Sequence, residues 1–148
     1  MSIWKELYEI YISERSRWQA NSQGKRALQF ELSHNMTLLA EGLQQHTAQA
    51  ALIAGLEVTA FQQAMQTGLN LAAMGRGKVA AKNVGDYREF KRYLGKQADE
   101  LIINLYARIR TLQKLSTAEP QRDYALKLRS LLRFMVFITL YLQDKPLK

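Results

Sequence analysis

The chain of 148 residues contains no cysteine, only two histidines and only two prolines. Without cysteine there is neither a disulfide nor a thiolate metal site, and the composition fits a reducing compartment such as the cytoplasm. The most apolar run, LLRFMVFITLYL at 131–142, contains Arg133 and is shorter than the roughly 20 residues that a membrane span needs. We therefore expect a cytoplasmic protein with no membrane segment, in which this run is a buried helix.

The scarcity of histidine also limits the chemistry. Glu31 and His34 form a Glu-x-x-His pair on one helical face, as in di-iron bundles, but the chain has no second copy of that motif. A helical RNase of the HEPN class has an arginine four to six residues ahead of a histidine, whereas Arg26 is the nearest before His34 and His46 has none nearby. The GRGK run at 75–78 lacks the spacing, hydroxyl and strand of a P-loop. We expect no catalytic residue, no metal and no cofactor.

The positions of the apolar residues predict the fold class. They recur at the helical period in five long segments, and no segment alternates with period two for long enough to form a strand. The sequence therefore predicts an all-α protein, a single-domain bundle of about five helices spanning residues 1–148. The predicted helices cover residues 3–20, 25–43, 47–73, 86–112 and 120–143.

Local signals suggest where the later helices begin. Asp86 followed by Glu89 resembles a capping box, and so does Ser116 followed by Glu119, with Pro120 suited to a first helical turn. The alanine-rich segment 47–73 allows close helix approach, so we expect it to be the central helix. The core is predicted to include Trp4, Leu28, Leu39, Leu56, Phe61, Leu101, Leu105, Leu131 and Met135.

The net charge of +8 is unevenly distributed along the chain. Residues 1–75 carry five basic and six acidic residues, a net charge of −1, and residues 76–148 carry sixteen basic and seven acidic residues, a net charge of +9. An excess confined to one half of a chain suggests an anionic partner: a nucleic acid, an acidic protein or a membrane surface.

The basic residues cluster at a loop containing glycines, about 75–85, and at the start of the helix predicted to follow it. Arg88, Arg92 and Lys96 lie four apart, on one face of that helix. Loop amides and cations suit phosphate oxygens, and Tyr87 and Tyr93 are candidates for stacking on unpaired bases. The alternative is that these residues form only a solvated helix face and a disordered loop. The predicted nucleic-acid-binding residues are Arg76, Lys78, Lys82, Arg88, Lys91, Arg92, Lys96, Arg122, Arg129 and Arg133.

Two of these residues sit within the apolar run of the last helix. Desolvating an arginine without a partner is costly. We therefore expect Arg129 and Arg133 to meet an anion or a carboxylate such as Asp99 or Glu100.

Two stretches, LSHNMTLLAEGLQQHTAQAALI at 32–53 and RDYALKLRSLLRFMVFITLYL at 122–142, resemble the small-subunit family of type III CRISPR effector complexes. In the first, an amphipathic helix ends at Gly42-Leu43, and in the second a tyrosine precedes a Leu/Arg-rich final helix. The resemblance implies a small, basic, all-helical and non-catalytic subunit of an antiviral defense complex. Such subunits pack side by side and help to hold the target strand.

These observations suggest two classes of function. The first is a non-catalytic subunit that binds the backbone of RNA or single-stranded DNA within a larger complex, beside other protein subunits that include copies of itself. The alternative is a protein-interaction module, of the immunity or inhibitor type, that docks its basic face on an acidic partner.

Overall fold

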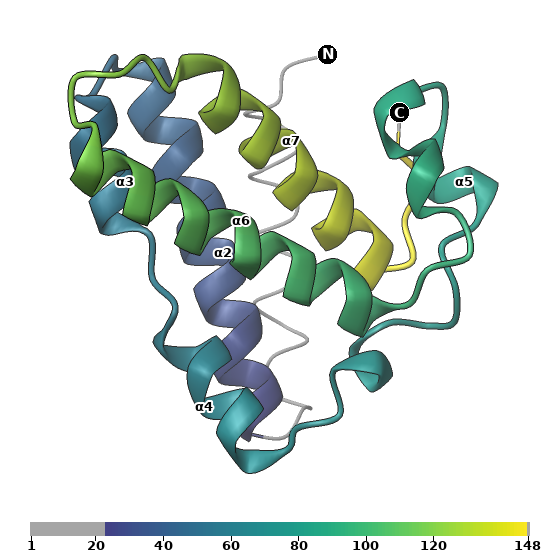
Figure 1. Cartoon of the computed structure of the whole chain (residues 1–148). Helices are drawn as coiled ribbons and strands as arrows, with labels where there is room; N and C mark the ends of the chain where they lie inside the picture. Colours follow the sequence, from purple (N-terminus) through teal and green to yellow (C-terminus); the bar gives the residue numbers. More distant parts are fainter. Residues whose placement is uncertain (1–22, 148) are drawn as a thin grey trace.

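The computed structural model describes residues 23–147, and within that range it is all-α, as predicted (Figure 1). The predicted helix 3–20 and its core residue Trp4 lie outside the described residues. The elements in chain order are α2 (Gln23–Gln44), α3 (Gln49–Gly55), α4 (Thr59–Thr67), the 3₁₀ helix η2 (Leu71–Met74), α5 (Ala81–Val84), the 3₁₀ helix η3 (Arg88–Tyr93), α6 (Ala98–Ala118) and α7 (Ala125–Leu142).

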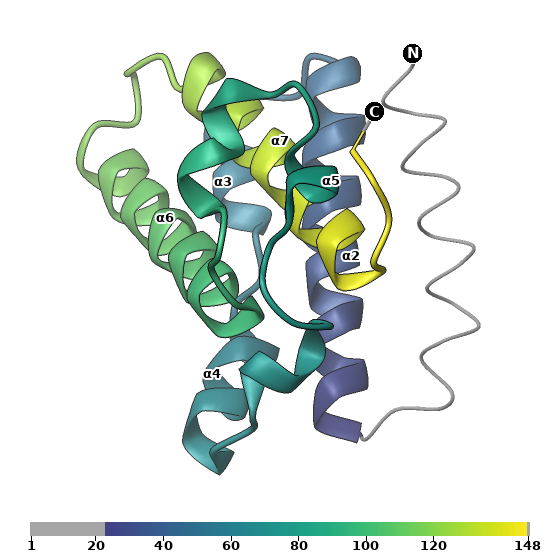
Figure 2. The same ribbon diagram turned by 90° about the vertical axis from the view of Figure 1, so that its right-hand side faces the viewer.

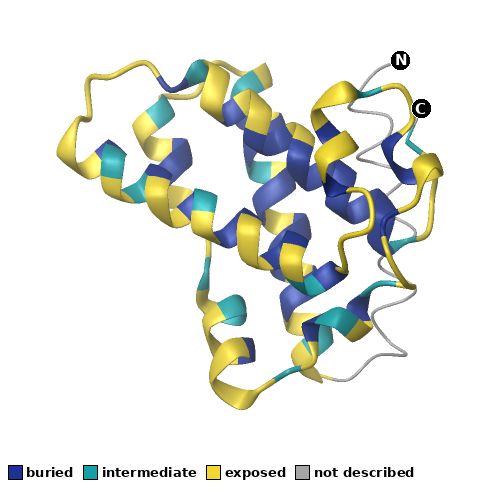
Figure 3. Cartoon of the chain, turned by 45° about the vertical axis from the view of Figure 1, so that its right-hand side comes forward, coloured by how far each residue is buried: buried dark blue, intermediate teal, exposed yellow. Residues whose placement is uncertain are grey.

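Helix α7 is the centre of the molecule. It packs against α2, α6 and α5, and its second half is buried on all sides (Figure 3). Within residues 131–142, Arg133 is the one exposed position. A helix that is apolar on every side has neighbours on every side. The expectation of a buried helix at 131–142 is confirmed, and none of the described helices is long and apolar enough to cross a membrane.

The prediction of one central helix over 47–73 is wrong. The segment breaks after Gly55, where Leu56 is extended, and again at Gly68, which has a positive φ. A break inside a bundle leaves backbone groups without helical partners, and these must be satisfied by other groups. Here side chains from α2 and α6 supply the bonds.

Three polar side chains hold the break between α3 and α4. The amide of Asn35 both donates to the carbonyl and accepts from the N–H of Glu57, each at 2.8 Å. Gln113 Nε2 donates to the carbonyls of Ile53 and Leu56 at the end of α3. The carboxylate of Glu31 accepts the N–H groups of Ala60 (2.8 Å) and Phe61 (3.1 Å) at the start of α4. In a continuous helix these backbone groups would bond one another, and Asn35 and Glu31, which are buried, would lose these hydrogen bonds.

The segment 86–112, predicted as one helix, forms two separate elements, η3 and α6. Gly95 adopts a positive φ of 81°, and α6 begins only at Ala98. No Asp86–Glu89 capping box forms, because Glu89 instead pairs with Arg133 of α7. Leu94, predicted on the apolar stripe, is 45% exposed because the helical period does not continue through the glycine.

The start of the last helix was also predicted too early. Ser116 is buried inside α6, which continues to Ala118, and Pro120 lies in the turn that follows. Helix α7 begins at Ala125, whose N–H is accepted by Asp123 Oδ1 at 2.9 Å. The local signal is therefore Asp123, which lies one residue before the N-cap Tyr124 and whose carboxylate forms a turn with the Ala125 N–H.

The predicted core is largely confirmed. Phe61 is only partly buried, and its ring stacks on Tyr106 with a centroid separation of 4.2 Å. The other predicted core residues within the described range are buried: Leu28, Leu39, Leu56, Leu101, Leu105, Leu131 and Met135.

Candidate nucleic-acid interface

Residues 75–97, which we name the cover segment, lie across the outer side of α7 between α6 and α2 (Figure 2). The ring of Phe90 stacks on Phe137 at 4.5 Å, and the ring of Tyr93 stacks on Phe134 at 5.0 Å. Val79 and Val84 are also buried. The sequence of the cover segment thus supplies inward apolar residues although it lacks a long helix.

Backbone hydrogen bonds fix the shape of the cover segment. Val79 donates to the carbonyl of Lys96 (2.8 Å), and Gly95 donates to the carbonyl of Val79 (3.0 Å), so the two ends of the segment are joined. The hydroxyl of Tyr141 on α7 donates to the carbonyl of Gly77. The segment is therefore an ordered support and not a loose connection.

Glycine is required at one point of this support. A Cβ at Gly75 would lie 2.5 Å from Tyr141 Oη and 3.0 Å from Ala98 Cβ, so a side chain at this position would displace Tyr141 of α7. The GRGK run is thus explained by packing at its first glycine.

Every basic side chain of the cover segment is exposed. Two form ion pairs: Lys82 with Asp144 at 2.8 Å, and Lys96 with Glu100 at 3.4 Å. The hydrogen bond and charge of Lys82 lower the pKa of Asp144, and Arg76 lies close enough to contribute. In the described part of the chain, no carboxylate lies within 4.0 Å of the other five: Arg76, Lys78, Arg88, Lys91 and Arg92.

The predicted row of Arg88, Arg92 and Lys96 does not form. A 3₁₀ helix has three residues per turn, so η3 aligns Arg88 with Lys91. Arg92 instead places its Cζ 5.0 Å from the centroid of the Tyr93 ring. Lys96 follows the turn at Gly95, two residues before α6 begins, and pairs with Glu100 of that helix.

The arginines of the last helix are exposed, contrary to the expectation that the apolar run desolvates them. Arg133 does meet a carboxylate, but it is Glu89 of η3 and not Asp99 or Glu100, and its Cζ lies 5.6 Å from the Tyr87 centroid. Arg129 lies one turn earlier on α7, exposed and without a carboxylate within 4.0 Å among the described residues. Arg122 pairs with Glu119 in the turn before α7.

The rings of the two tyrosines predicted to stack on bases are packed against other side chains of the protein. Tyr93 is 6% exposed and packed on Phe134, so its ring cannot receive a base. Tyr87 is half-buried against Phe90 and under Arg133. Any contact with nucleic acid at this surface therefore involves cations and backbone amides more than aromatic stacking.

The side chains of Glu31 and His34 do not meet at one site. Glu31 is buried and accepts a third hydrogen bond, from Tyr106 Oη at 2.8 Å, while His34 is exposed, 3.6 Å from Glu57. Burial and the neighbouring carboxylate of Glu31 raise the pKa of Tyr106. Among residues 23–147, no group of three or more histidine, aspartate or glutamate side chains is arranged to hold a metal ion.

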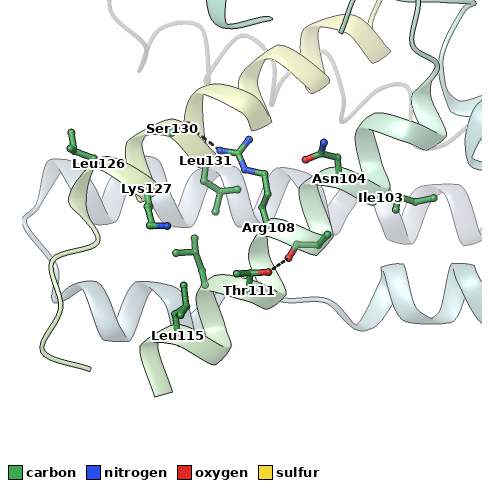
Figure 4. A pocket seen from close by; sticks show the side chains of 11 residues that line it. Ile103, Asn104, Arg108, Thr111, Leu115, Leu126, Lys127, Ser130 and Leu131 are labelled. Carbon is green, nitrogen blue, oxygen red and sulfur yellow. Dashed lines mark hydrogen bonds between the residues drawn. The ribbon is translucent and has the colours of Figure 1, made fainter. Parts of the chain in front are cut away.

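The sequence did not predict the groove that lies between α6 and α7. A groove of about 590 Å³ runs between α6 and α7, and Arg108 projects into it (Figure 4). Arg108 Nη2 donates to Ser130 Oγ at 3.0 Å, and its Cζ lies 4.8 Å from the Phe134 centroid. Nothing in the sequence separates Arg108 from Arg110, because only the packing of α6 on α7 decides which of the two lines a groove.

No protein-family model, no curated protein and no solved structure matches the chain.

Proposed function

We propose that the chain is a non-catalytic helical subunit that binds the backbone of RNA or single-stranded DNA within a larger complex. The resemblance noted above suggests the kind of complex, a CRISPR RNA-guided effector in which a small subunit helps to hold the target strand. The observation that carries the proposal is the cover segment, an ordered support whose apolar side chains face α7 and whose basic side chains all face solvent.

The distribution of ion pairs supports this proposal. Of the ten predicted cations, Lys82, Lys96, Arg122 and Arg133 have carboxylate partners. Exposed ion pairs contribute only about 0–1 kcal/mol, so a phosphate competes readily even for these four. The other six have no carboxylate within 4.0 Å in the described residues, which favours an external anion.

Rigidity of the support also favours phosphate binding. A flexible loop would lose conformational entropy on ordering around a strand, whereas the hydrogen-bonded cover segment holds Arg88 and Lys91 in place beforehand. Contacts of this kind position a backbone without reading its sequence. We therefore expect similar affinity for strands of different sequence.

The test is the salt dependence of binding to mixed-sequence single-stranded RNA and DNA, measured by fluorescence anisotropy. Each phosphate contact contributes about −0.7 to the slope of log K against log salt concentration. Replacing Arg88 and Lys91 together by alanine should weaken binding and reduce the slope by about 1.4. The chain is measured alone and with its native partners, because adjacent subunits would extend a basic track.

The matched control removes the same charge elsewhere. Arg110 and Lys114 are exposed on α6 and four residues apart, so their double alanine variant carries the same net charge as the Arg88/Lys91 variant. Binding by this control should retain the parent slope. Equal losses in both variants, or no loss in either, would reject the cover segment as the contact surface, and the acidic-protein partner would then be preferred.

A further inference from the structure

The groove between α6 and α7 has the shape and lining of a helix-docking site. Leu112, Leu115 and Leu131 contribute to its lining, and Figure 4 shows side chains from both helices around it. Two large apolar side chains on its lining remain in solvent: Ile103 is 43% exposed and Leu126 is 79% exposed. Two packed helices leave between them a furrow into which the side-chain ridge of a third helix fits.

The charge of the groove indicates what such a helix must carry. Its lining includes two cations, Arg108 and Lys127, and no acidic residue. Arg108 is partly buried, donates a hydrogen bond to the hydroxyl of Ser130 and lies over the face of Phe134. No carboxylate lies within 4.0 Å of it in the described chain.

The surroundings of Arg108 disfavour its positive charge. Burial lowers its pKa, and the positive charge of Arg92 on the cover segment lowers it further, while Tyr93 has the opposite effect. A partly desolvated guanidinium with a second arginine beside it favours an incoming carboxylate.

We propose that this groove binds an amphipathic helix of a partner protein, with apolar residues spaced three and four apart and an aspartate or glutamate that reaches Arg108. The apolar residues cover Ile103 and Leu126, and the carboxylate completes the hydrogen bonding of the guanidinium. A nucleic-acid strand does not fit the groove as well, because its phosphates would leave these aliphatic side chains uncovered. The residues that line the groove all lie outside the cover segment, so peptide binding can be tested separately from nucleic-acid binding.

The test uses synthetic amphipathic helices of about 18 residues, or five turns, with a leucine stripe and one central glutamate. Sister peptides carry glutamine or lysine at the central position. The parent chain should bind the glutamate peptide about tenfold more tightly than the glutamine peptide, and the lysine peptide least. The Arg108→Glu variant should reverse the order of the glutamate and lysine peptides, a charge exchange that a general loss of apolar contact would not produce.

Substitutions of exposed residues locate the bound peptide without disturbing the core. Leu126→Ser and Ile103→Ser should weaken binding of the glutamate peptide, whereas Met65→Ser on α4, which removes a side chain that is also half-exposed, should not. The helical circular dichroism signal and melting temperature of each variant check that the fold is retained. Crosslinking from a photoreactive residue at position 126 should label the peptide.

Several results would overturn the proposal. They are the absence of peptide binding, equal affinity for the three peptides, or binding that survives Leu126→Ser. Self-association of the parent chain that Leu126→Ser abolishes, and that no peptide inhibits, would instead identify a second copy as the occupant. The Arg88/Lys91 alanine variant should bind peptide like the parent, and Leu126→Ser should bind RNA like the parent, so failure of one site is distinguishable from failure of the other.

Discussion

Tyr106 on α6 donates a 2.8 Å hydrogen bond to the buried carboxylate of Glu31 on α2, across 75 positions of sequence. The same carboxylate accepts two backbone N–H groups at the start of α4. One side chain thus connects three helices, and it does so at the break that separates α4 from α3. Hydrogen bonds to a buried charged group are among the stronger ones in proteins.

We predict that Tyr106→Phe lowers the free energy of unfolding by about 1.5–3 kcal/mol, because the carboxylate of Glu31 loses a buried donor. The measurement is urea denaturation followed by circular dichroism. Tyr93→Phe is the matched control: Tyr93 is also buried, but its hydroxyl makes no hydrogen bond to a described residue. Equal costs for the two variants would show that the Glu31 bond contributes little.

The glycines of α2 should respond oppositely to alanine. A Cβ at Gly42 would lie 3.0 Å from Leu52 Cγ and closer still to Leu52 Cδ2, whereas a Cβ at Gly24 would meet only Leu69, at 3.8 Å. Gly42→Ala should therefore destabilise the protein by about 1–3 kcal/mol. Gly24→Ala should be neutral or stabilising by up to about 1 kcal/mol, because alanine favours the helix. Thermal and urea unfolding of the two variants test the contrast, and a stabilised Gly42→Ala would contradict the close approach of α3.

Asp123 should contribute to the loss of folding stability at acid pH. Hydrogen bonds from the Ala125 N–H and from Gln49 lower its pKa below the ordinary value of 3.8. A carboxyl whose pKa is lower in the folded state stabilises the fold fully above the unfolded pKa, and this stabilisation is lost as the pH falls through the folded pKa.

The melting temperature measured from pH 7 to pH 2 tests this assignment. Asp123→Asn should lower the melting temperature at pH 7 and reduce the difference between neutral and acid pH. Asp86→Asn removes an exposed carboxylate that makes no hydrogen bond to a described residue, so its curve should follow that of the parent. Identical pH profiles for the parent and Asp123→Asn would reject the assignment.

The two histidines should be dispensable for nucleic-acid binding. His34 is exposed, with Nε2 3.6 Å from a carboxylate oxygen of Glu57, and His46 has a positive φ of 56° just after α2. Replacing His34 by glutamine and His46 by asparagine, which tolerates that φ, should leave the fold and the RNA affinity close to those of the parent. Stoichiometric metal in the parent, or a nuclease activity lost in this variant, would contradict the proposed absence of catalysis.

The class of fold followed from the sequence because helical periodicity is a local property. The helix at 25–43 was predicted within two residues of α2, and nearly all predicted core residues within the described range are buried. The exposed basic residues were also predictable as a group, since charge clustering is visible in the order of residues.

The positions of the helix breaks and the details of both surfaces depended on the tertiary structure. The segment 47–73 has a continuous helical pattern, yet the side chains of Glu31, Asn35 and Gln113 bond the interrupted backbone and offset the lost helical bonds. Arg88 and Lys91 align only because η3 packs on α7 as a 3₁₀ helix. Arg108 lines a groove because α6 turns that face toward α7. Each outcome rests on contacts between residues far apart in the chain, which local spacing does not specify.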